Sequence, residues 1–323
     1  MNKKEKSQFN IRLARWEDVE SVAKIMYAVY ESIGDAETAD SAEDIAHYWK
    51  HPSFNPETDA FIAENSQGEA IGYWEVFNAH ENTQIDFEGY VYPKYNDTPL
   101  TELLMLRAEE RAMQFIPFAA PEARVFIRSS MGIKEHEYRA LHERLGYVPV
   151  RYFWRMEIKL ENAPQVQPLP EGIEFCPFIP QEHARLVWEA ENEAFRDHWG
   201  SHDSKYEEWH QRKLERPEFD PALWLIAWDG DQIAGLSQNR YLNEIGWVGT
   251  LGVRRAWRKK GLGLALLTHS FAEFYKRGIT TVGLGVDAAN PTGATRLYEK
   301  AGMSVANEYV AYEKELRAAS AQA

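Results

Sequence analysis

The sequence predicts two α/β (α+β) domains of the same design, each a mixed central sheet flanked by helices. The 323 residues are enough for two domains of ordinary size. A proline-rich stretch with almost no hydrophobic periodicity, residues 161–171, divides the chain near its middle. The segments on either side of it carry similar elements in the same order. We therefore expect a first domain over residues 1–160, a linker over 161–171 and a second domain over 172–323.

The repeated elements are a short strand, an amphipathic helix, an apolar hairpin, a further strand, a long helix and another strand. They fall at residues 9–13, 18–30, 60–73, 85–92, 100–115 and 124–128 in the first half, and at 173–178, 180–195, 224–236, 247–253, 261–277 and 281–286 in the second. Each half then carries a helix that ends at a glycine, Gly146 or Gly302, the residue type that most often follows a helix. Both halves finish with a strand, which ends at Leu160 or at Leu316. An ordered repeat of this length favours a duplicated domain over chance.

Composition excludes several classes of protein. Cys176 is the only cysteine, so no intrachain disulfide can form, and we expect a reducing, cytoplasmic location. No run of 18 apolar residues predicts a membrane span, and no apolar stretch follows the basic residues 1–8 as in a secretory signal. The net charge of −14 disfavours nucleic-acid binding and mildly favours a cationic substrate, although most such charge serves solubility.

The stretch from Leu251 to Leu267 carries the strongest chemical signal. A strand ends at Val253 and a helix begins near Gly261. Five cations lie between them or at the helix entrance: Arg254, Arg255, Arg258, Lys259 and Lys260. Cations are mildly unfavourable at a helix N-terminus, so their clustering points to an anion bound there. Gly261 and Gly263 lack Cβ atoms, which would let a pyrophosphate approach the backbone. A solvated basic turn is the alternative, but the combination of features favours an anion site.

The segment Arg258-Lys259-Lys260-Gly261-Leu262-Gly263 resembles the Arg/Gln-x-x-Gly-x-Gly/Ala signature of the GNAT acetyltransferase superfamily. Residues 297–303, Leu-Tyr-Glu-Lys-Ala-Gly-Met, are similar to the family's Leu-Tyr-Glu-Lys-x-Gly-Phe stretch, with Met303 in place of Phe. The resemblance covers the C-terminal half, and the tandem arrangement resembles two-domain members such as mycothiol synthase. It implies two tandem GNAT-like domains and acetyl transfer from acetyl-CoA to a small-molecule or peptide amine, without a metal ion.

The resemblance also implies which residues bind acetyl-CoA. The backbone of Leu251, Gly252 and Val253 would pair with the pantetheine arm. The pyrophosphate would lie on the backbone of Arg258, Lys259, Lys260, Gly261, Leu262 and Gly263. Asn290 would contact the pantetheine or adenosine arm, or would instead be a turn residue before Pro291; both interpretations stay open.

Two catalytic roles follow from the resemblance. Two parallel strands would separate to admit the thioester, and Tyr298 would protonate the departing thiolate, because a phenol stays protonated at neutral pH. A base is needed because a primary amine with a pKa of roughly 10 is mostly protonated near pH 7. Glu244 is the only carboxylate in residues 243–250, but a solvated turn residue is an equal alternative. Asp287 is a second candidate, so the base stays open.

Residues 194–205 form the connection that covers the acceptor side in the implied fold. Aromatic and polar residues interleave there, as in pocket lids, although a surface loop whose Phe195 and Trp199 cap the core is an equal alternative. His198 and His202 are four residues apart. No Glu intervenes and no cysteine is near, so we expect no zinc site.

The leading functional hypothesis is an acetyl-CoA-dependent N-acetyltransferase whose C-terminal domain is catalytic. The alternatives are a different acyl-CoA donor, a thiol or hydroxyl acceptor, or a non-catalytic module that senses acyl-CoA. Tyr298 argues against the last alternative. The sequence predicts neither the acceptor nor the oligomeric state.

The first half is not expected to bind acetyl-CoA. Pro93 and Pro99 remove backbone N–H donors at the place that corresponds to the basic loop. Asp97 and Glu102 add negative charge there. His142 stands where the second half has Tyr298. We expect this degenerate domain to help shape the acceptor pocket instead.

Overall fold

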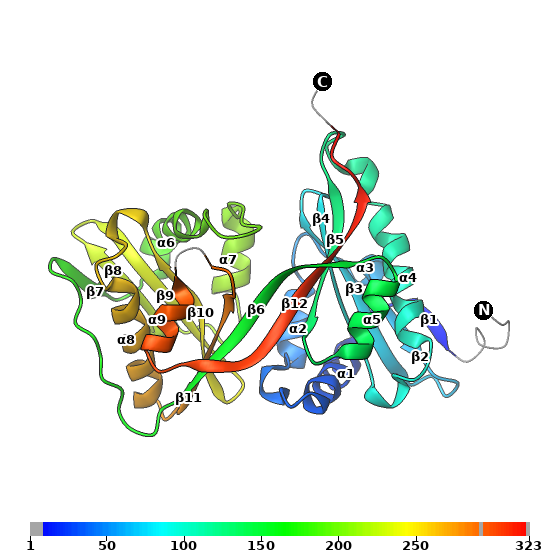
Figure 1. The fold of residues 1–323 in the computed structure, drawn as a ribbon, viewed down its shortest axis with the longest axis horizontal. Helices are drawn as coiled ribbons and strands as arrows, with labels where there is room; N and C mark the ends of the chain where they lie inside the picture. Colours follow the sequence, from blue (N-terminus) through cyan, green and yellow to red (C-terminus); the bar gives the residue numbers. More distant parts are fainter. Residues whose placement is uncertain (1–8, 291–292, 321–323) are drawn as a thin grey trace. The chain divides into compact units, whose positions relative to one another are not determined.

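The computed structural model describes residues 9–290 and 293–320 (Figure 1). The chain forms two compact units. The first comprises the described residues up to Arg151 and from Val310 onward, and the second comprises Tyr152–Tyr309. Each unit combines a mixed sheet with helices, which confirms the predicted α/β class. Among the described residues, no helix is long and apolar enough to cross a membrane.

The sheet of the first unit runs in the order β1-β2-β3-β4-β5, followed by the last part of β12. The strands are β1 (Asn10–Leu13), β2 (Ala60–Glu64), β3 (Ala70–His80), β4 (Gln84–Val91), β5 (Val125–Gly132) and β12 (Ser304–Arg317). The helices are α1 (Val19–Ser32), α2 (Ala42–Tyr48), α3 (Pro56–Asp59), α4 (Leu100–Met113) and α5 (His136–Arg144). Neighbouring strands from β1 to β4 are antiparallel, whereas β4 and β5 are parallel. Gly146 follows α5 with a φ of 88°, the left-handed conformation expected after a helix.

The sheet of the second unit runs in the order β6-β11-β10-β9-β8-β7. The strands are β6 (Val148–Lys159), β7 (Ile173–Cys176), β8 (Trp224–Asp229), β9 (Gln232–Leu242), β10 (Ile245–Val253) and β11 (Thr281–Asp287). The helices are α6 (Pro180–Phe195), α7 (Tyr206–Leu214), α8 (Leu262–Lys276) and α9 (Ala294–Lys300). Strands β10 and β11 are parallel, whereas β6 with β11, β9 with β10, β8 with β9 and β7 with β8 are antiparallel. The predicted helix over 180–195 is confirmed, and α7 is an addition to the predicted elements.

Helices α6 and α8 cover opposite faces of this sheet, as the side chains of β9 show. Ser237 hydrogen-bonds Ser270 of α8 at 2.9 Å, whereas the next residue, Gln238, donates to Glu191 of α6 at 2.7 Å. Successive side chains of a strand point to opposite faces, so each helix contacts a different face. On the α8 face, a Cβ at Gly246 would lie 2.7 Å from the Phe274 ring, so close packing requires glycine there.

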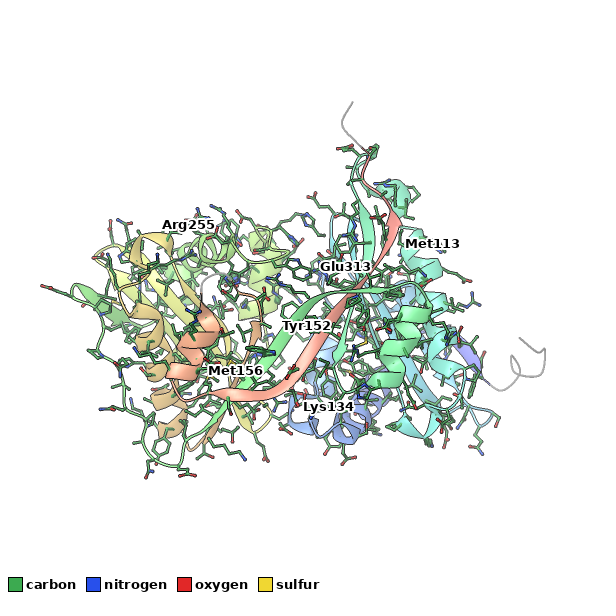
Figure 2. The ribbon with its side chains drawn as sticks, viewed as in Figure 1. Met113, Lys134, Tyr152, Met156, Arg255 and Glu313 are labelled. Carbon is green, nitrogen blue, oxygen red and sulfur yellow. The ribbon has the colours of Figure 1, made fainter. Side chains whose placement is uncertain are left out.

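Each half of the chain gives most of its final strand to the other unit. From Tyr152 onward β6 belongs to the second unit, where it pairs antiparallel with β11. From Val310 onward β12 belongs to the first unit, where Glu313 (Figure 2) accepts from Arg124 at 2.9 Å and from Arg128 at 2.7 Å. The two ion pairs join β12 to β5 and to the chain just before it. We refer to this arrangement as the strand exchange.

The division between the units therefore differs from the sequence-based boundaries at 1–160 and 172–323. Residues 161–171 contain no helix or strand, as expected of a linker. They belong to the second unit, in which the Gln167 N–H donates to Thr268 Oγ1 on α8 at 3.0 Å. Residues 161–171 thus contact α8 of the second unit through Gln167.

Candidate active site

Strands β10 and β11 are paired only at their beginnings. Their parallel register joins Gly246 to Val282 and Trp247 to Gly283, although β10 continues to Val253. On its other edge, β10 shifts register against β9 between Val248 and Thr250, which marks a β-bulge. The two central strands therefore separate toward their carboxyl ends. On the side of β10 that faces β11, Leu251 to Val253 therefore have no strand partner among the described residues.

A loop with exposed backbone donors follows β10. Lys259 and Gly261 have left-handed φ angles of 63° and 88°, and Gly261 caps α8. The first N–H groups of any helix have no acceptor within it. No described group accepts a hydrogen bond from the N–H groups of Lys259 through Leu264. Because these donors and the positive helix end occur together, the loop is suited to an anion such as a pyrophosphate.

Three of the five cations in this loop bind carboxylates of α6 or of the residues just after it. Arg254 donates to Glu193 at 2.7 Å. Arg255 and Arg258 both pair with Asp197, the latter at 3.0 Å. Their hydrogen bonds lower the pKa of the Asp197 carboxyl. These arginines therefore attach the loop to the end of α6, a role that the sequence did not predict.

Lys259 and Lys260 are the remaining cations, and both are exposed. Neither lysine has an ion-pair partner within the ranges that the structure describes. The positive charge offered to an anion thus comes chiefly from two lysines and the end of α8. This is a smaller cationic contribution than five free side chains would give.

The glycines of the motif have different structural roles. A Cβ at Gly261 would have no atom within 4 Å, so this residue supplies a left-handed turn with an open face. A Cβ at Gly263 would lie 3.0 Å from Leu297 Cδ1, so this glycine lets α8 approach α9. A Cβ at Gly252 would lie 3.1 Å from both Ala194 Cβ and the Phe195 ring. Gly252 therefore allows α6 to pack against β10.

Tyr298 lies on α9 beside the separated strands. Its side chain packs in one apolar cluster with Leu251 of β10 and with Leu284 and Val286 of β11. It is 7% exposed, and burial raises the pKa of its hydroxyl to about 12. No group in the described part of the chain hydrogen-bonds this hydroxyl. The phenol therefore remains protonated at neutral pH and is available to donate.

Glu244 does not lie near Tyr298. It is exposed in the two-residue turn between β9 and β10. Leu251 is seven residues further along an extended strand, a separation of roughly 23 Å. Asp287, the second candidate base, ends β11, and its carboxylate accepts from the Ala289 N–H at 2.9 Å. The structure thus does not bring Glu244 into the site formed by the other predicted residues.

Asn290 lies in the turn after β11, where its N–H donates to the Asp287 carbonyl at 3.0 Å. Its position near the carboxyl end of β11 is compatible with either predicted role. The residues just beyond it, Pro291 and Thr292, lie outside the described ranges.

The segment after α6 covers the carboxyl ends of the two strands. The Phe195 ring lies against β10, 3.1 Å from where a Cβ on Gly252 would be. The Trp199 ring lies 6.0 Å from the ring of Phe153 on β6. Phe153 is the strand partner of Asp287 at the end of β11. Burial, followed by the charge of Arg258, lowers the pKa of His198, so its imidazole is neutral at pH 7. The sequence placed His198 in the connection that covers the acceptor side and assigned it no individual role there. Among the described residues, no group of acidic, His or Cys side chains could hold a metal ion.

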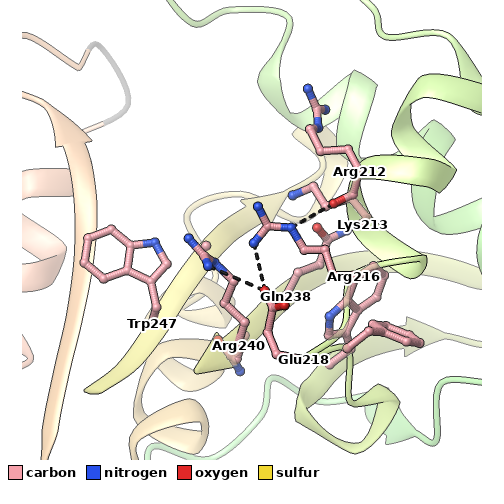
Figure 3. A pocket seen from close by; sticks show the side chains of 11 residues that line it. Arg212, Lys213, Arg216, Glu218, Gln238, Arg240 and Trp247 are labelled. Carbon is pink, nitrogen blue, oxygen red and sulfur yellow. Dashed lines mark hydrogen bonds and ion pairs between the residues drawn. The ribbon is translucent and has the colours of Figure 1, made fainter. Parts of the chain in front are cut away.

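A pocket of about 230 Å³ lies beside the bulge of β10 (Figure 3). Its lining comes from α7, the segment after it, and strands β8, β9 and β10: Arg212, Lys213, Arg216, Glu218, Phe219, Trp224, Gln238, Asn239, Arg240, Trp247 and Gly249. Lys213 Nζ donates to Thr250 Oγ1 at 2.8 Å, directly before Leu251. The sequence missed this basic pocket because its cations are distributed over several elements. The only signal was the basic end of the unpredicted α7.

Comparison with known proteins agrees with this architecture. The pattern of the Acetyltransferase (GNAT) family matches residues 184–303. The mycothiol acetyltransferase of Streptomyces scabiei is 32% identical over 181 residues, which are 55% of this chain and 56% of that protein. The aligned part thus spans about half the length of this curated relative.

Two solved structures extend the similarity over both units. A GCN5-related N-acetyltransferase from Sphaerobacter thermophilus is 34% identical, with a TM-score of 0.80 over 97% of this chain and 98% of the other. A tandem GNAT protein from the clavulanic acid biosynthesis pathway has a TM-score of 0.76 over 98% of this chain and all of the other, at 14% identity, which shows the fold alone. This chain belongs to the GNAT acetyltransferase family and has its tandem form.

Proposed function

We propose that the protein transfers the acetyl group of acetyl-CoA to an amine, and that the second unit catalyses the transfer. The observation that carries this proposal is the position of Tyr298. Its protonated hydroxyl, without a partner in the described chain, lies beside two parallel strands that separate toward a helix N-terminus. The family membership and the relatives named mycothiol acetyltransferase support acetyl transfer to a small molecule.

The residues present fit the cosubstrate. The unpartnered edge of β10 at Leu251, Gly252 and Val253 would hold the pantetheine arm by backbone hydrogen bonds. The N–H groups from Lys259 through Gly263 would hold the pyrophosphate, with Lys259 and Lys260 adding positive charge. When bound, acetyl-CoA supplies an acetyl thioester whose carbonyl carbon accepts the amine nitrogen while the C–S bond breaks.

Tyr298 then donates its hydroxyl proton to the thiolate sulfur. The amine nitrogen loses one proton as the C–N bond forms, and this proton restores the phenol through solvent, so charge and protons balance. The Phe195 and Trp199 side chains cover the strand ends and exclude water from the thioester.

The described residues of the first unit differ from this arrangement at the corresponding positions. Pro99 caps α4, and Glu102 in its first turn pairs with Arg144 at 3.0 Å. An ion pair thus stands where the second unit has two lysines without carboxylate partners in the described chain. His142, which corresponds to Tyr298, is fully buried, and burial lowers its pKa to about 4. We therefore assign acetyl-CoA binding to the second unit alone.

A thiol-release assay tests the proposal. The full chain is incubated with acetyl-CoA and a panel of amines, and free CoA thiol and acetylated amine are measured together. We expect both products in equal amounts. Binding of acetyl-CoA without acetylation of any amine, or thiol release equal in the presence and absence of amine, would contradict an N-acetyltransferase.

A further inference from the structure

A lysine of α7 is hydrogen-bonded to the bulge of β10. Lys213 Nζ donates to Thr250 Oγ1 at 2.8 Å, and Thr250 directly follows Gly249, the residue that the register shift leaves unpaired. Thr250 is 6% exposed. Among the described residues, no other side chain hydrogen-bonds its hydroxyl. This bond therefore connects α7 to the place where β10 separates from β11.

A buried carboxylate of α6 holds the ammonium group of Lys213 in this position. Glu191 Oε1 lies 3.5 Å from Lys213 Nζ. Its Oε2 accepts from Trp209 Nε1 and from Gln238 Nε2, both at 2.7 Å. Burial raises the pKa of the Glu191 carboxyl, but the charge of Lys213 and the two hydrogen bonds outweigh burial and lower this pKa overall. Because a buried charge without a partner is costly, the lysine stays beside this ionised carboxylate.

The backbone of β10 presents alternate residues to its two neighbours. The Arg254 N–H donates to a carbonyl of β9 at 3.0 Å. In an antiparallel pair, the residues that bond to one neighbour alternate along the strand. Every second residue before Arg254 therefore faces β9. The N–H groups of Leu251 and Val253 face the other side, where β11 has separated.

The bulge determines which residues these are. Strand β10 pairs with β9 up to Val248 in one register and from Thr250 onward in a register shifted by one residue. An extra residue reverses the alternation, so without the bulge Thr250 and Gly252 would face the separated side instead. The bulge thus directs the Leu251 N–H toward the place proposed for the thioester.

The corresponding strands of the first unit pair without a bulge at this place. Strands β3 and β4 keep one register from the pair of Gly72 with Val91 to the pair of Asn78 with Ile85. Their register shift lies between Asn78 and His80, beside the turn that joins the two strands. The bulge and the lysine that contacts it thus occur together in the unit that carries Tyr298.

We propose that Lys213 is a positioning residue for acetyl transfer: it holds Thr250 and thereby keeps the Leu251 N–H directed at the thioester carbonyl oxygen. This inference rests on the acetyl transfer proposed above. Negative charge develops on that oxygen as the amine attacks, and a preorganised backbone N–H stabilises it. Loss of one such donor typically reduces kcat by about 10²–10³-fold, so a displaced donor should cost about tenfold or more.

Replacement of Thr250 tests the inference on the full chain. Thr250→Val keeps the shape of the side chain and the ion pair of Lys213 but removes the hydrogen-bond acceptor. We expect kcat, measured by thiol release with an amine that the wild type acetylates, to fall about tenfold or more. The Kd for CoA, measured by calorimetry, should stay within about threefold of the wild type. Thr250→Ser retains the hydroxyl and should keep kcat within about threefold.

Two further variants assign the effect to the bond between Lys213 and Thr250. Thr268 is also 6% exposed and accepts from the Gln167 N–H at 3.0 Å on α8, so Thr268→Val is a matched control that should leave kcat unchanged. Lys213→Met removes the donor. In this background Thr250→Val should cause no further loss, because the bond is already absent. If Lys213→Met does not fold, the two Thr250 variants decide the question.

A spectroscopic measurement separates this inference from the proposed function. A hydrogen bond to the thioester oxygen moves the carbonyl resonance of bound acetyl-CoA, labelled with ¹³C at the acetyl carbonyl, downfield of its free value. This displacement should be smaller in Thr250→Val than in the wild type or in Thr250→Ser. If no amine is acetylated, the proposed function fails, and this resonance alone decides the role of Lys213.

Two results would overturn the inference while the proposed function stands. One is a carbonyl resonance that is the same in the wild type and in Thr250→Val. The other is a loss of kcat that is equal in Thr250→Val and Thr250→Ser, because the hydroxyl would then not matter.

Discussion

Replacement of Gly261 by aspartate should abolish most CoA affinity while leaving the fold intact. A Cβ at this position meets no atom within 4 Å, so the new side chain causes no clash. The left-handed φ of 88° costs an ordinary L-residue about 1–2 kcal/mol. A negative charge at a helix N-terminus stabilises the helix by about 0.3–1 kcal/mol, which offsets part of this cost. The free energy of unfolding should therefore fall by only about 1 kcal/mol.

The effect on CoA is much larger. A carboxylate about 5 Å from a phosphate charge is repelled by about 3 kcal/mol at an effective dielectric constant of 20, or roughly two orders of magnitude in Kd. Isothermal titration calorimetry with CoA measures this directly. The penalty should shrink as salt concentration rises, because these charges lie at the surface.

Two controls isolate the cause. Gly261→Asn has nearly the same size and the same tolerance of the left-handed region but no charge, so its loss of affinity should be much smaller. Gly278 has a φ of 82° at the opposite end of α8, also with no atom near a Cβ. Gly278→Asp should leave CoA affinity unchanged. Equal Kd values for the Asp and Asn variants at position 261 would refute the placement of the pyrophosphate.

Three further predictions concern catalysis and stoichiometry. Tyr298→Phe removes a hydroxyl that has no hydrogen-bond partner among the described residues, so the free energy of unfolding should hardly change. In steady-state kinetics kcat should fall about 10²–10⁴-fold. A loss below about threefold would mean that another group protonates the thiolate. Glu244→Gln changes an exposed turn, so kcat should stay within about threefold of the wild type, and a larger decrease would restore Glu244 as a base. Calorimetry on the intact chain should give one CoA per chain, because prolines and Glu102 occupy the equivalent region of the first unit; a stoichiometry of two would contradict this assignment.

Much of the second unit was predictable because its local signals are strong. The helix over 180–195 and the strand over 281–286 have clear periodicity, and the structure places them at Pro180–Phe195 and Thr281–Asp287. Helix α7 was missed because Trp209 is its only fully buried side chain, so its apolar stripe is weak. A sequence shows such a stripe only where several residues face the core.

Long-range partners account for the rest. Arg255 and Arg258 looked like phosphate ligands, but both pair with Asp197, which is about sixty residues earlier in the chain. The cations of the pocket, such as Arg216 and Arg240, also come together only through the pairing of separate elements. The strand exchange was not predicted because alternation within a strand indicates which face is buried but not which strand is its neighbour.

The strand exchange has a consequence for how the protein is made. The first unit lacks its β12 segment until synthesis has passed Val310. The rest of this unit has already been synthesised when the ribosome passes Arg151. At roughly 5–20 residues per second, the ribosome needs about 10–30 s to cover that interval. During this time β5 presents an unpaired edge without the Glu313 carboxylate that later binds Arg124 and Arg128. Charged side chains at a sheet edge disfavour pairing with other chains, and Glu313 binds these two arginines when the last strand arrives.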